Sequence, residues 1–350
     1  MSGGVDSSVA AALLKLEGFE VIGMMLRLWS EPGAEDSNRC CTPDAMAQAR
    51  RVAAILDIPF YAVDAKDIFH QTVVQYFIDG YTQGNTPNPC LVCNRIVRWS
   101  FLLERALAFD AQFLATGHYA RLSRTSTGPI QLLKAIDTHK DQSYVLHVLD
   151  QDRLSHALFP LGELNKTEVR EIARELRLPV AERKESQDLC FLGDGNYQGF
   201  LMRNHPDAVR PGPIVSTEGR ELGKHQGLAF YTIGQRKGLG ITSSKPLYVV
   251  EKNIEHNTLI VGLREETHYS SLVAGNLKWV NSQEPKTPFQ AGIKVRYKAS
   301  EVAGVVHPLE GSRIKIEFEE PVTDLTPGQA AVIYNGDICL GGGIILHATR

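Results

Sequence analysis

The sequence predicts an α/β fold: a domain with a parallel sheet, then a small linker domain, and then a C-terminal β-barrel. From residue 9 to residue 147, short apolar runs alternate with helical patterns, as in a parallel sheet covered by helices. After residue 197 the chain changes to glycine, proline and short alternating runs, which are typical of antiparallel strands. A length of 350 residues, 43% of them hydrophobic, is enough for separate cores. We therefore expect domains at 1–197, 198–268 and 269–350.

Local signals place the elements of the first domain. The first helix ends at Gly18, and a second begins at Thr42-Pro43 and runs to Leu56. A later helix has the clearest signal, because Asn165 caps it, Glu168 completes a capping box and an apolar stripe follows. Short apolar runs predict strands at 21–26, 60–63 and 113–115.

Alternating residues and a cluster of cations mark the C-terminal region. Residues 293–298 and 314–318 alternate between apolar and charged side chains, which predicts half-buried antiparallel strands. Between residues 278 and 298, five cations face only Glu284. This pattern fits an RNA-binding surface, and it also fits the solvated face of a strand. The net charge of -3 gives no overall sign of nucleic-acid binding, and we expect no DNA partner.

The chain opens on a loop of glycines and hydroxyl residues that leads directly into the first helix. Adjacent glycines let the backbone approach a phosphate, and the free amides at a helix start attract negative charge. No Lys-Ser or Lys-Thr pair follows, so the loop is not a Walker motif. An ordinary Gly-Gly turn with a helix cap is the alternative. The residues concerned are Ser2, Gly3, Gly4, Val5, Asp6, Ser7 and Ser8.

The position of this loop raises a question about the sheet. A phosphate loop of this kind normally follows a buried parallel strand, but only Met1 precedes Ser2. We therefore expect the first, central strand to be missing, and a chain extended upstream to be more stable. No apolar stretch approaches the roughly 18 residues of a membrane helix, and no signal peptide precedes the loop, so we expect a cytoplasmic protein without a membrane partner.

Six cysteines are too few for a disulfide scaffold in a chain of this length. The turn-forming segment 85–94 has two prolines and brings Cys93 to an expected helix start, where the helix dipole favours a thiolate. The segment 184–192 changes abruptly from polar to apolar around Cys190, which is typical of a cleft wall. We assign no catalytic role to Cys40 and Cys41, and we expect Cys339 to be a barrel residue.

Taken together, these segments resemble the tRNA-specific 2-thiouridylases, a family of ATP pyrophosphatase-loop enzymes that place sulfur on C2 of the wobble uridine of tRNA. The resemblance follows the family's order over nearly all of the chain, and it implies an adenine nucleotide alpha hydrolase-like first domain. The matching segments are Ser2–Ser8, Thr86–Asn94, Ala115–Tyr119, Lys140–Ser143, Ser186–Phe191, Gly234–Gly238, Val295–Tyr297, Pro327–Gln329 and Cys339–Gly343.

The resemblance implies a reaction in two stages. ATP first converts the C2 oxygen of uridine 34 into an adenylate, because a carbonyl oxygen is not itself a leaving group. Cys190 then carries a persulfide sulfur from a donor protein, and Cys93 completes its transfer as AMP departs. A disulfide between Cys93 and Cys190 would remain and would have to be reduced before the next cycle. ATP and Mg2+ are the implied cofactors.

The resemblance also implies binding residues. The phosphates of ATP would lie on the N-terminal loop, with Leu26 and Gly117 beside the adenine and ribose. A flipped-out target base would lie among Asn88, Pro89 and Cys90. Other residues would contact tRNA, although His118 could instead cap its own turn and Tyr297 could pack the barrel. These tRNA residues are His118, Lys140, Asp141, Gln142, Arg296, Tyr297 and Gln329.

Cys90 leaves alternatives open, because many relatives have Asp at that position. Together with Cys93 and Cys190 it could hold an iron-sulfur cluster with one open iron, or a zinc ion. Two further alternatives are an amide-forming adenylating synthetase and an RNA-binding protein without catalysis. The paired cysteines favour thiolation over both.

Overall fold

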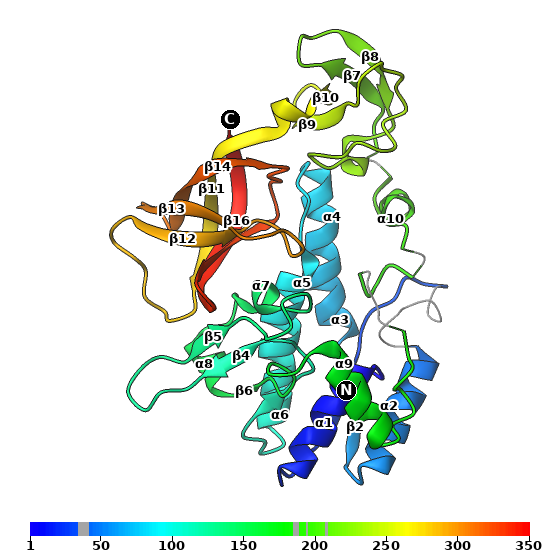
Figure 1. Ribbon diagram of the computed structural model, residues 1–350. Helices are drawn as coiled ribbons and strands as arrows, with labels where there is room; N and C mark the ends of the chain where they lie inside the picture. Colours follow the sequence, from blue (N-terminus) through cyan, green and yellow to red (C-terminus); the bar gives the residue numbers. More distant parts are fainter. Residues whose placement is uncertain (34–41, 185–188, 194, 207–208) are drawn as a thin grey trace.

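The computed structural model describes residues 1–33, 42–184, 189–193, 195–206 and 209–350, and Figure 1 shows its arrangement. The first part of the chain alternates helices and strands, as expected. Its elements are α1 (Val5–Leu16), β1 (Gly23–Arg27), α2 (Pro43–Ile55), β2 (Phe60–Asp64), α3 (Lys66–Phe69), α4 (Gln75–Thr82), α5 (Pro89–Val92), α6 (Leu103–Leu107), β3 (Leu114–Ala115), β4 (Arg121–Ser123), β5 (Gln131–Leu133), α7 (Ser143–Leu146), α8 (Gln151–Ser155), β6 (Ala157–Leu158), α9 (Lys166–Glu175) and α10 (Tyr197–Asn204).

Four strands of the first part, β1, β2, β3 and β6, form parallel pairs, as the sequence predicts. β1 pairs with β2, and β3 pairs with β6. In the described part of the chain these are two separate two-stranded sheets. The α2 helix begins after Thr42, whose side chain accepts a hydrogen bond from the amide of Ala45, and α9 has the predicted capping box of Asn165 and Glu168. The strands, Thr42 and the capping box are therefore confirmed.

The linker region is a small four-stranded sheet with the order β8-β7-β10-β9. The β7 and β10 strands are parallel, and the other pairs are antiparallel. Its core is continuous with that of the first part, because Ile214 and Val249 belong to the same buried cluster as Phe77. The strands are β7 (Gly212–Ser216), β8 (Glu221–His225), β9 (Tyr248–Asn253) and β10 (Thr258–Gly262).

The C-terminal region is a closed barrel. Six strands follow in the order β11-β14-β13-β12-β15-β16, and β11 also pairs with β16 to close the ring. The predicted β-barrel is therefore confirmed, and Cys339 is a buried residue of its last strand. The strands are β11 (His268–Trp279), β12 (Phe289–Lys294), β13 (Val302–Leu309), β14 (Arg313–Thr323), β15 (Ala330–Asn335) and β16 (Ile338–Thr349).

One predicted strand is shorter than expected. The alternation over residues 293–298 is visible in the burial of Ile293 and Val295, but β12 ends at Lys294. Beyond it the chain turns, and the amide of Ala299 donates to the carbonyl of Arg296 over 3.1 Å. The expected strand through residue 298 is wrong because this turn replaces the ladder hydrogen bonds there.

A hairpin of the first part extends the barrel sheet, which the sequence analysis did not predict. β4 and β5 form this hairpin, and β5 pairs with β16 through Leu132 and Cys339. Leu132 is fully buried and shares a hydrophobic cluster with Tyr334 of the barrel and Trp99 of the first part. The barrel is thus joined to the first part by a common core.

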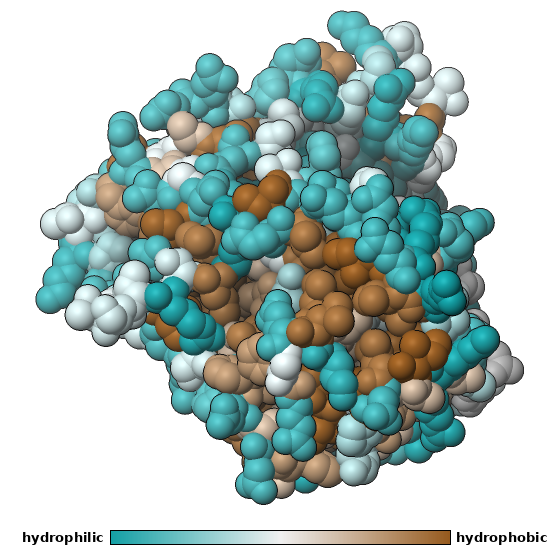
Figure 2. All heavy atoms as spheres, turned by 60° about the horizontal axis from the view of Figure 1, so that its bottom comes forward, coloured by the Kyte–Doolittle hydropathy of each residue, from teal (hydrophilic) through white to brown (hydrophobic). Residues whose placement is uncertain are grey.

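Apolar side chains are also exposed at the end of the first part that lies away from the barrel. Figure 2 shows them gathered on the face that lies at the bottom of Figure 1. The helices α1, α2 and α6 end there, and Leu16, Ile55 and Leu107 near those ends are exposed. Within the ranges that the structure describes, no helix has both the length and the apolar character to cross a membrane.

The shared core predicts a large effect of one substitution. Leu132→Ala should lower the free energy of unfolding by about 2–5 kcal/mol, because it leaves a cavity between the hairpin and the barrel. Leu346→Ala is the matched control, since Leu346 lies on the same sheet and is 45% exposed. Denaturant unfolding measures both. Equal losses in the two variants would contradict this packing.

Candidate nucleotide and sulfur-transfer site

The N-terminal loop leaves the amides at the start of α1 without a side-chain cap. Gly4 is the N-cap residue, and the hydroxyls of Ser7 and Ser8 donate to its carbonyl oxygen instead. Gly3 has a φ of +72°, and a Cβ atom there would lie 2.3 Å from the carbonyl oxygen of Ala45. The loop therefore lies directly on the first turn of α2, with its helix-start amides available to an anion.

Gly117, in the turn after β3, also packs against the N-terminal loop. A Cβ at Gly117 would lie 2.8 Å from the carbonyl carbon of Asp6 and from the amide nitrogen of Ser7. Gly117 follows β3, and Leu26 lies at the end of β1, so both are at the carboxyl ends of parallel strands. Ligands of parallel α/β sheets bind at that edge. The structure thus brings Gly117 to the N-terminal loop. Leu26 lies in a different sheet, and its place beside the nucleotide stays a prediction.

The carboxylate of Asp6 connects the loop to two distant segments. Its Oδ1 atom accepts a hydrogen bond from the Tyr119 hydroxyl at 2.8 Å and lies 2.6 Å from Nζ of Lys166. Lys166 is the first residue of α9, where a lysine would normally be a solvated helix residue. Neither partner is predicted by the sequence, since nothing local distinguishes Lys166, and Tyr119 stands out only as part of a matching segment.

A second cation, Arg183, also contacts the N-terminal loop. The guanidinium of Arg183 donates to the carbonyl of Gly3 over 3.1 Å and pairs with Asp44 at 2.9 Å. Arg183 belongs to the segment that leads toward Cys190. This contact joins the segment after α9 to the N-terminal loop.

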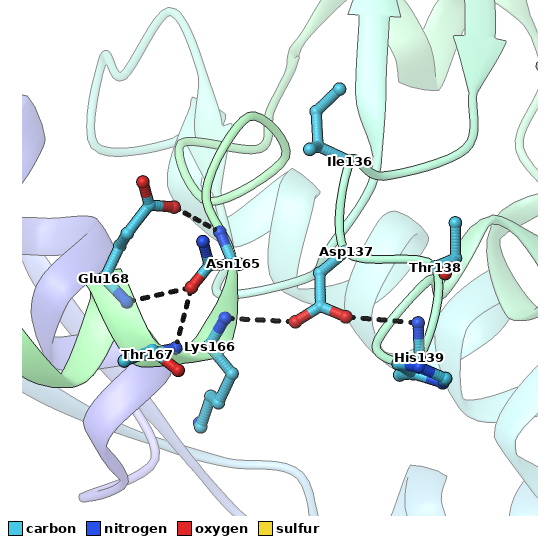
Figure 3. A pocket seen from close by; sticks show the side chains of 8 residues that line it. All are labelled: Ile136, Asp137, Thr138, His139, Asn165, Lys166, Thr167 and Glu168. Atoms are coloured by element: carbon cyan, nitrogen blue, oxygen red, sulfur yellow. Dashed lines mark hydrogen bonds between the residues drawn. The ribbon is translucent and has the colours of Figure 1, made fainter.

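An open hollow lies beside Lys166. Its volume is about 560 Å3, and Figure 3 shows the side chains that line it. The carboxylate of Asp137 accepts hydrogen bonds from the amides of Lys166 and His139, so it joins the start of α9 to the turn before Lys140. The lining residues are Ile136, Asp137, Thr138, His139, Asn165, Lys166, Thr167 and Glu168.

Cys93 lies one turn further into its helix than expected. The helix begins at Pro89, and Asn88 caps it by accepting a hydrogen bond from the amide of Cys90. Cys93 is buried, and it begins a π-helical segment that runs to Leu102. The expectation that Cys93 starts the helix is wrong, because Pro89 takes the first position. π-helical turns are rare in proteins, but those that occur are often found at functional sites.

Cys93 and Cys190 border the same buried cluster. Cys93 belongs to it, Cys190 packs against it, and Phe191 fills the space next to Phe77. The folded chain thus carries the two cysteines to one apolar region although they are far apart in sequence. Residues 185–188 of the second cysteine motif, and Cys40 and Cys41, lie outside the described residues.

Cys90, Cys93 and Cys190 do not form a metal site within the described part of the chain. No group of three or more histidine, cysteine, aspartate or glutamate residues could hold a metal ion within the described ranges. Cys90 is exposed, whereas Cys93 is buried. The donor set therefore does not fit an iron-sulfur cluster or a zinc ion, and the cluster alternative is not favoured.

Three family models match the chain. They are the tRNA methyl transferase HUP domain over residues 1–194, the tRNA methyl transferase PRC-barrel domain over 198–263 and the aminomethyltransferase beta-barrel domain over 269–345. Full-length relatives give a more specific result. The chain is 47% identical to the tRNA-specific 2-thiouridylase MnmA of Moorella thermoacetica over 348 residues, which cover 99% of this chain and 98% of that protein.

This chain belongs to the tRNA-specific 2-thiouridylase family. Two further members agree with this assignment. One is MnmA 2 of Caldanaerobacter subterraneus subsp. tengcongensis, with 44% identity over 100% of this chain and 97% of that protein. The other is MnmA of Symbiobacterium thermophilum, with 45% identity over 99% of this chain and 91% of that protein.

Several residues that a 2-thiouridylase is expected to use for tRNA have protein partners in this fold. Asp141 is buried, and its carboxylate accepts hydrogen bonds from the amides of Ala135 and Ser143. The side chain of Gln142 accepts from the amide of Tyr119. These contacts shape the turn that presents Lys140, and tRNA binding by these residues stays a prediction.

The tRNA residues expected on the barrel lie at its junction with the first part. The Gln329 side chain donates to the carbonyl of Thr86 over 2.8 Å, and the amide of Thr86 donates to Pro327. Tyr297 packs against the cluster shared by both parts, whereas Arg296 is exposed and pairs with Asp324 at 3.3 Å. The barrel therefore holds the chain that leads into the Cys90–Cys93 turn.

His118 is a buried histidine within this 2-thiouridylase. Oγ1 of Thr116 lies 2.8 Å from Nδ1 of His118, so the imidazole is held against the turn that follows β3. Burial, and to a smaller extent the positive charge of Arg98, lowers the pKa of His118 to about 3. Its usual pKa is 6.5, so the imidazole stays neutral in the folded protein at neutral pH.

This pKa predicts a pH dependence of stability. Because the folded pKa lies below the unfolded one, the folded state loses stability as the pH falls from about 6.5 toward 3. His118→Gln should reduce the loss in free energy of unfolding between pH 7 and pH 5 by about 2 kcal/mol. Denaturant unfolding at the two pH values measures it, with exposed His256→Gln as the control. An unchanged loss in His118→Gln would contradict the burial of a neutral imidazole.

The close approach of Gly3 to α2 predicts a loss of nucleotide binding. Gly3→Ala should weaken ATP binding at least about tenfold, because the new methyl group displaces the loop from Ala45. Gly336→Ala is the matched control, since Gly336 also has a positive φ but its Cβ would meet no atom within 4 Å. Calorimetric titration with ATP measures both. Unchanged affinity in Gly3→Ala would contradict this position of the loop.

Proposed function

We propose that this protein carries out the ATP-dependent 2-thiolation of uridine 34, the wobble uridine of tRNA. Membership in the family supports this function. The single observation that carries it is the position of Cys93 and Cys190 at one buried cluster. An amide-forming synthetase does not need such a pair of thiols.

In the first step the enzyme makes the uridine oxygen a leaving group. The C2 oxygen attacks the α-phosphorus of ATP, the N3 proton leaves, and the bond from that phosphorus to the bridging oxygen breaks. The electron pair of the broken bond departs with pyrophosphate. The amides after Gly4 would bind the phosphates, because they are at an uncapped helix start. Leu26 and Gly117 would lie beside the rest of the nucleotide.

In the second step sulfur replaces the adenylate. The outer sulfur of a Cys190 persulfide attacks C2, and AMP leaves with the C2 oxygen and the electron pair of that bond. The thiolate of Cys93 then attacks the Sγ of Cys190, so the S–S bond breaks and the 2-thiouridine is released. The product is a Cys93–Cys190 disulfide, and a two-electron reductant must restore both thiols before the next turnover.

Mg2+ would accompany ATP as part of the substrate. The ion would offset the phosphate charge, and no site of three or more metal-binding side chains is present for it in the part of the chain that the structure describes. We place the reaction in the cytoplasm, where tRNA and a persulfide-carrying donor protein would be the partners.

The tRNA would lie along the junction of the barrel and the first part. Arg296 and Tyr297 come from the barrel at this junction, and Lys140 comes from the turn beside the N-terminal site. The flipped-out uridine would be placed beside Asn88, Pro89 and Cys90, at the start of the helix that carries Cys93. His118, Asp141, Gln142 and Gln329 would support this surface from beneath through the contacts described above.

Substitution of the two cysteines tests the proposal. Cys93→Ser and Cys190→Ser should each reduce the formation of thiolated tRNA at least about 10³-fold, because each removes a sulfur that the transfer needs. ATP affinity should stay within about twofold, since neither thiol contacts the phosphates. Cys40→Ser, at a cysteine without an assigned role, is the matched control.

The measurement is mass spectrometry of tRNA after incubation with ATP, Mg2+ and a persulfide donor. The expected product has one oxygen replaced by sulfur in the anticodon. Thiolation that continues in either cysteine variant would refute the persulfide route, and release of AMP without any sulfur in the tRNA would refute thiolation itself.

A further inference from the structure

The N-terminal loop lacks a cation of its own, but the fold brings Lys166 and Arg183 to it. Phosphate loops of the Walker type carry a lysine within the motif, and this loop has none between Ser2 and Ser8. The amino group of Lys166, which lies far along the chain, is 2.6 Å from the carboxylate of Asp6 in this loop. Tertiary structure thus puts a lysine where the local sequence has none.

The position of Lys166 is fixed from several sides. Its side chain is only 12% exposed, and its amino group lies 5.9 Å from the centre of the Tyr119 ring. Its backbone amide donates to Asp137 over 3.0 Å, and the capping box of Asn165 holds the helix turn that it begins. A lysine with so little freedom pays little further entropy when it binds an anion.

Charge explains why the loop needs this lysine. Asp6 is the second residue of α1, so its carboxylate lies among the helix-start amides that would receive the phosphates. An unneutralised carboxylate there would repel ATP.

We propose that Lys166 binds the phosphates of ATP and stabilises the departing pyrophosphate. This inference rests on the proposed function, because it concerns the adenylation step. When the bond between the α-phosphorus and the bridging oxygen breaks, its electron pair moves onto pyrophosphate, and the ammonium group of Lys166 offsets that charge. Asp6 and Tyr119 hold the amino group in place for this contact.

Replacing the lysine tests the contact. Lys166→Met keeps the length and apolar stem of the side chain but removes the charge. We expect a 10²- to 10³-fold fall in the rate of tRNA-dependent AMP release and weaker binding of inorganic pyrophosphate. Lys15→Met is the matched control, because Lys15 is exposed at the opposite end of α1 and should leave both quantities unchanged.

A double variant separates phosphate binding from simple neutralisation of Asp6. If Lys166 only neutralised that carboxylate, Asp6→Asn combined with Lys166→Met would restore AMP release to within about threefold of the Asp6→Asn variant. If Lys166 binds phosphate, the double variant stays at least about 30-fold below the Asp6→Asn variant. Restoration would overturn the inference, and so would a normal rate in Lys166→Met.

Two further measurements keep the result clear. Lys166→Arg retains the charge, so it should recover part of the pyrophosphate affinity even where Lys166→Met is less stable. Circular dichroism and tRNA binding should match the wild type in every variant that is scored. If the wild type itself releases no AMP with tRNA, the proposed function fails, whereas normal wild-type release with unaffected Lys166→Met overturns only the role of Lys166.

Discussion

The site depends on the contacts of one carboxylate, that of Asp6. It joins the start of α1 to Tyr119, which follows β3, and to Lys166, which begins α9. A hydrogen bond to a charged group contributes more than a neutral one, and the partners here are partly shielded from water. Because these segments meet at Asp6, the loop, the segment after β3 and α9 keep a fixed relation at the place where we propose that the nucleotide binds.

The barrel is an integral part of this arrangement. Its β16 strand pairs with β5 of the first part, and Gln329 and Pro327 hold Thr86 just before the turn of Cys90 and Cys93. A tRNA bound on the barrel would therefore be positioned relative to the cysteine turn by direct hydrogen bonds and by a shared core.

Local sequence signals predicted the features that depend on neighbouring residues. The capping box of Asn165 and the glycine loop are of this kind, and so is the alternation in the barrel strands. The sequence could not place Lys166 or Arg183, because their partners lie in the N-terminal region and only tertiary folding brings them together. The end of β12 was missed for a related reason, since the alternation in burial continues past Lys294 while the hydrogen-bonded ladder does not.

The proposed persulfide transfer requires Cys93 and Cys190 to meet during turnover. Peptide mapping under non-reducing conditions after a single turnover, with persulfide-loaded enzyme, ATP and tRNA, tests it most directly. The persulfide mechanism predicts one Cys93–Cys190 disulfide for each thiolated tRNA and none when ATP is left out. Thiolated tRNA formed while both cysteines remain as thiols would contradict it.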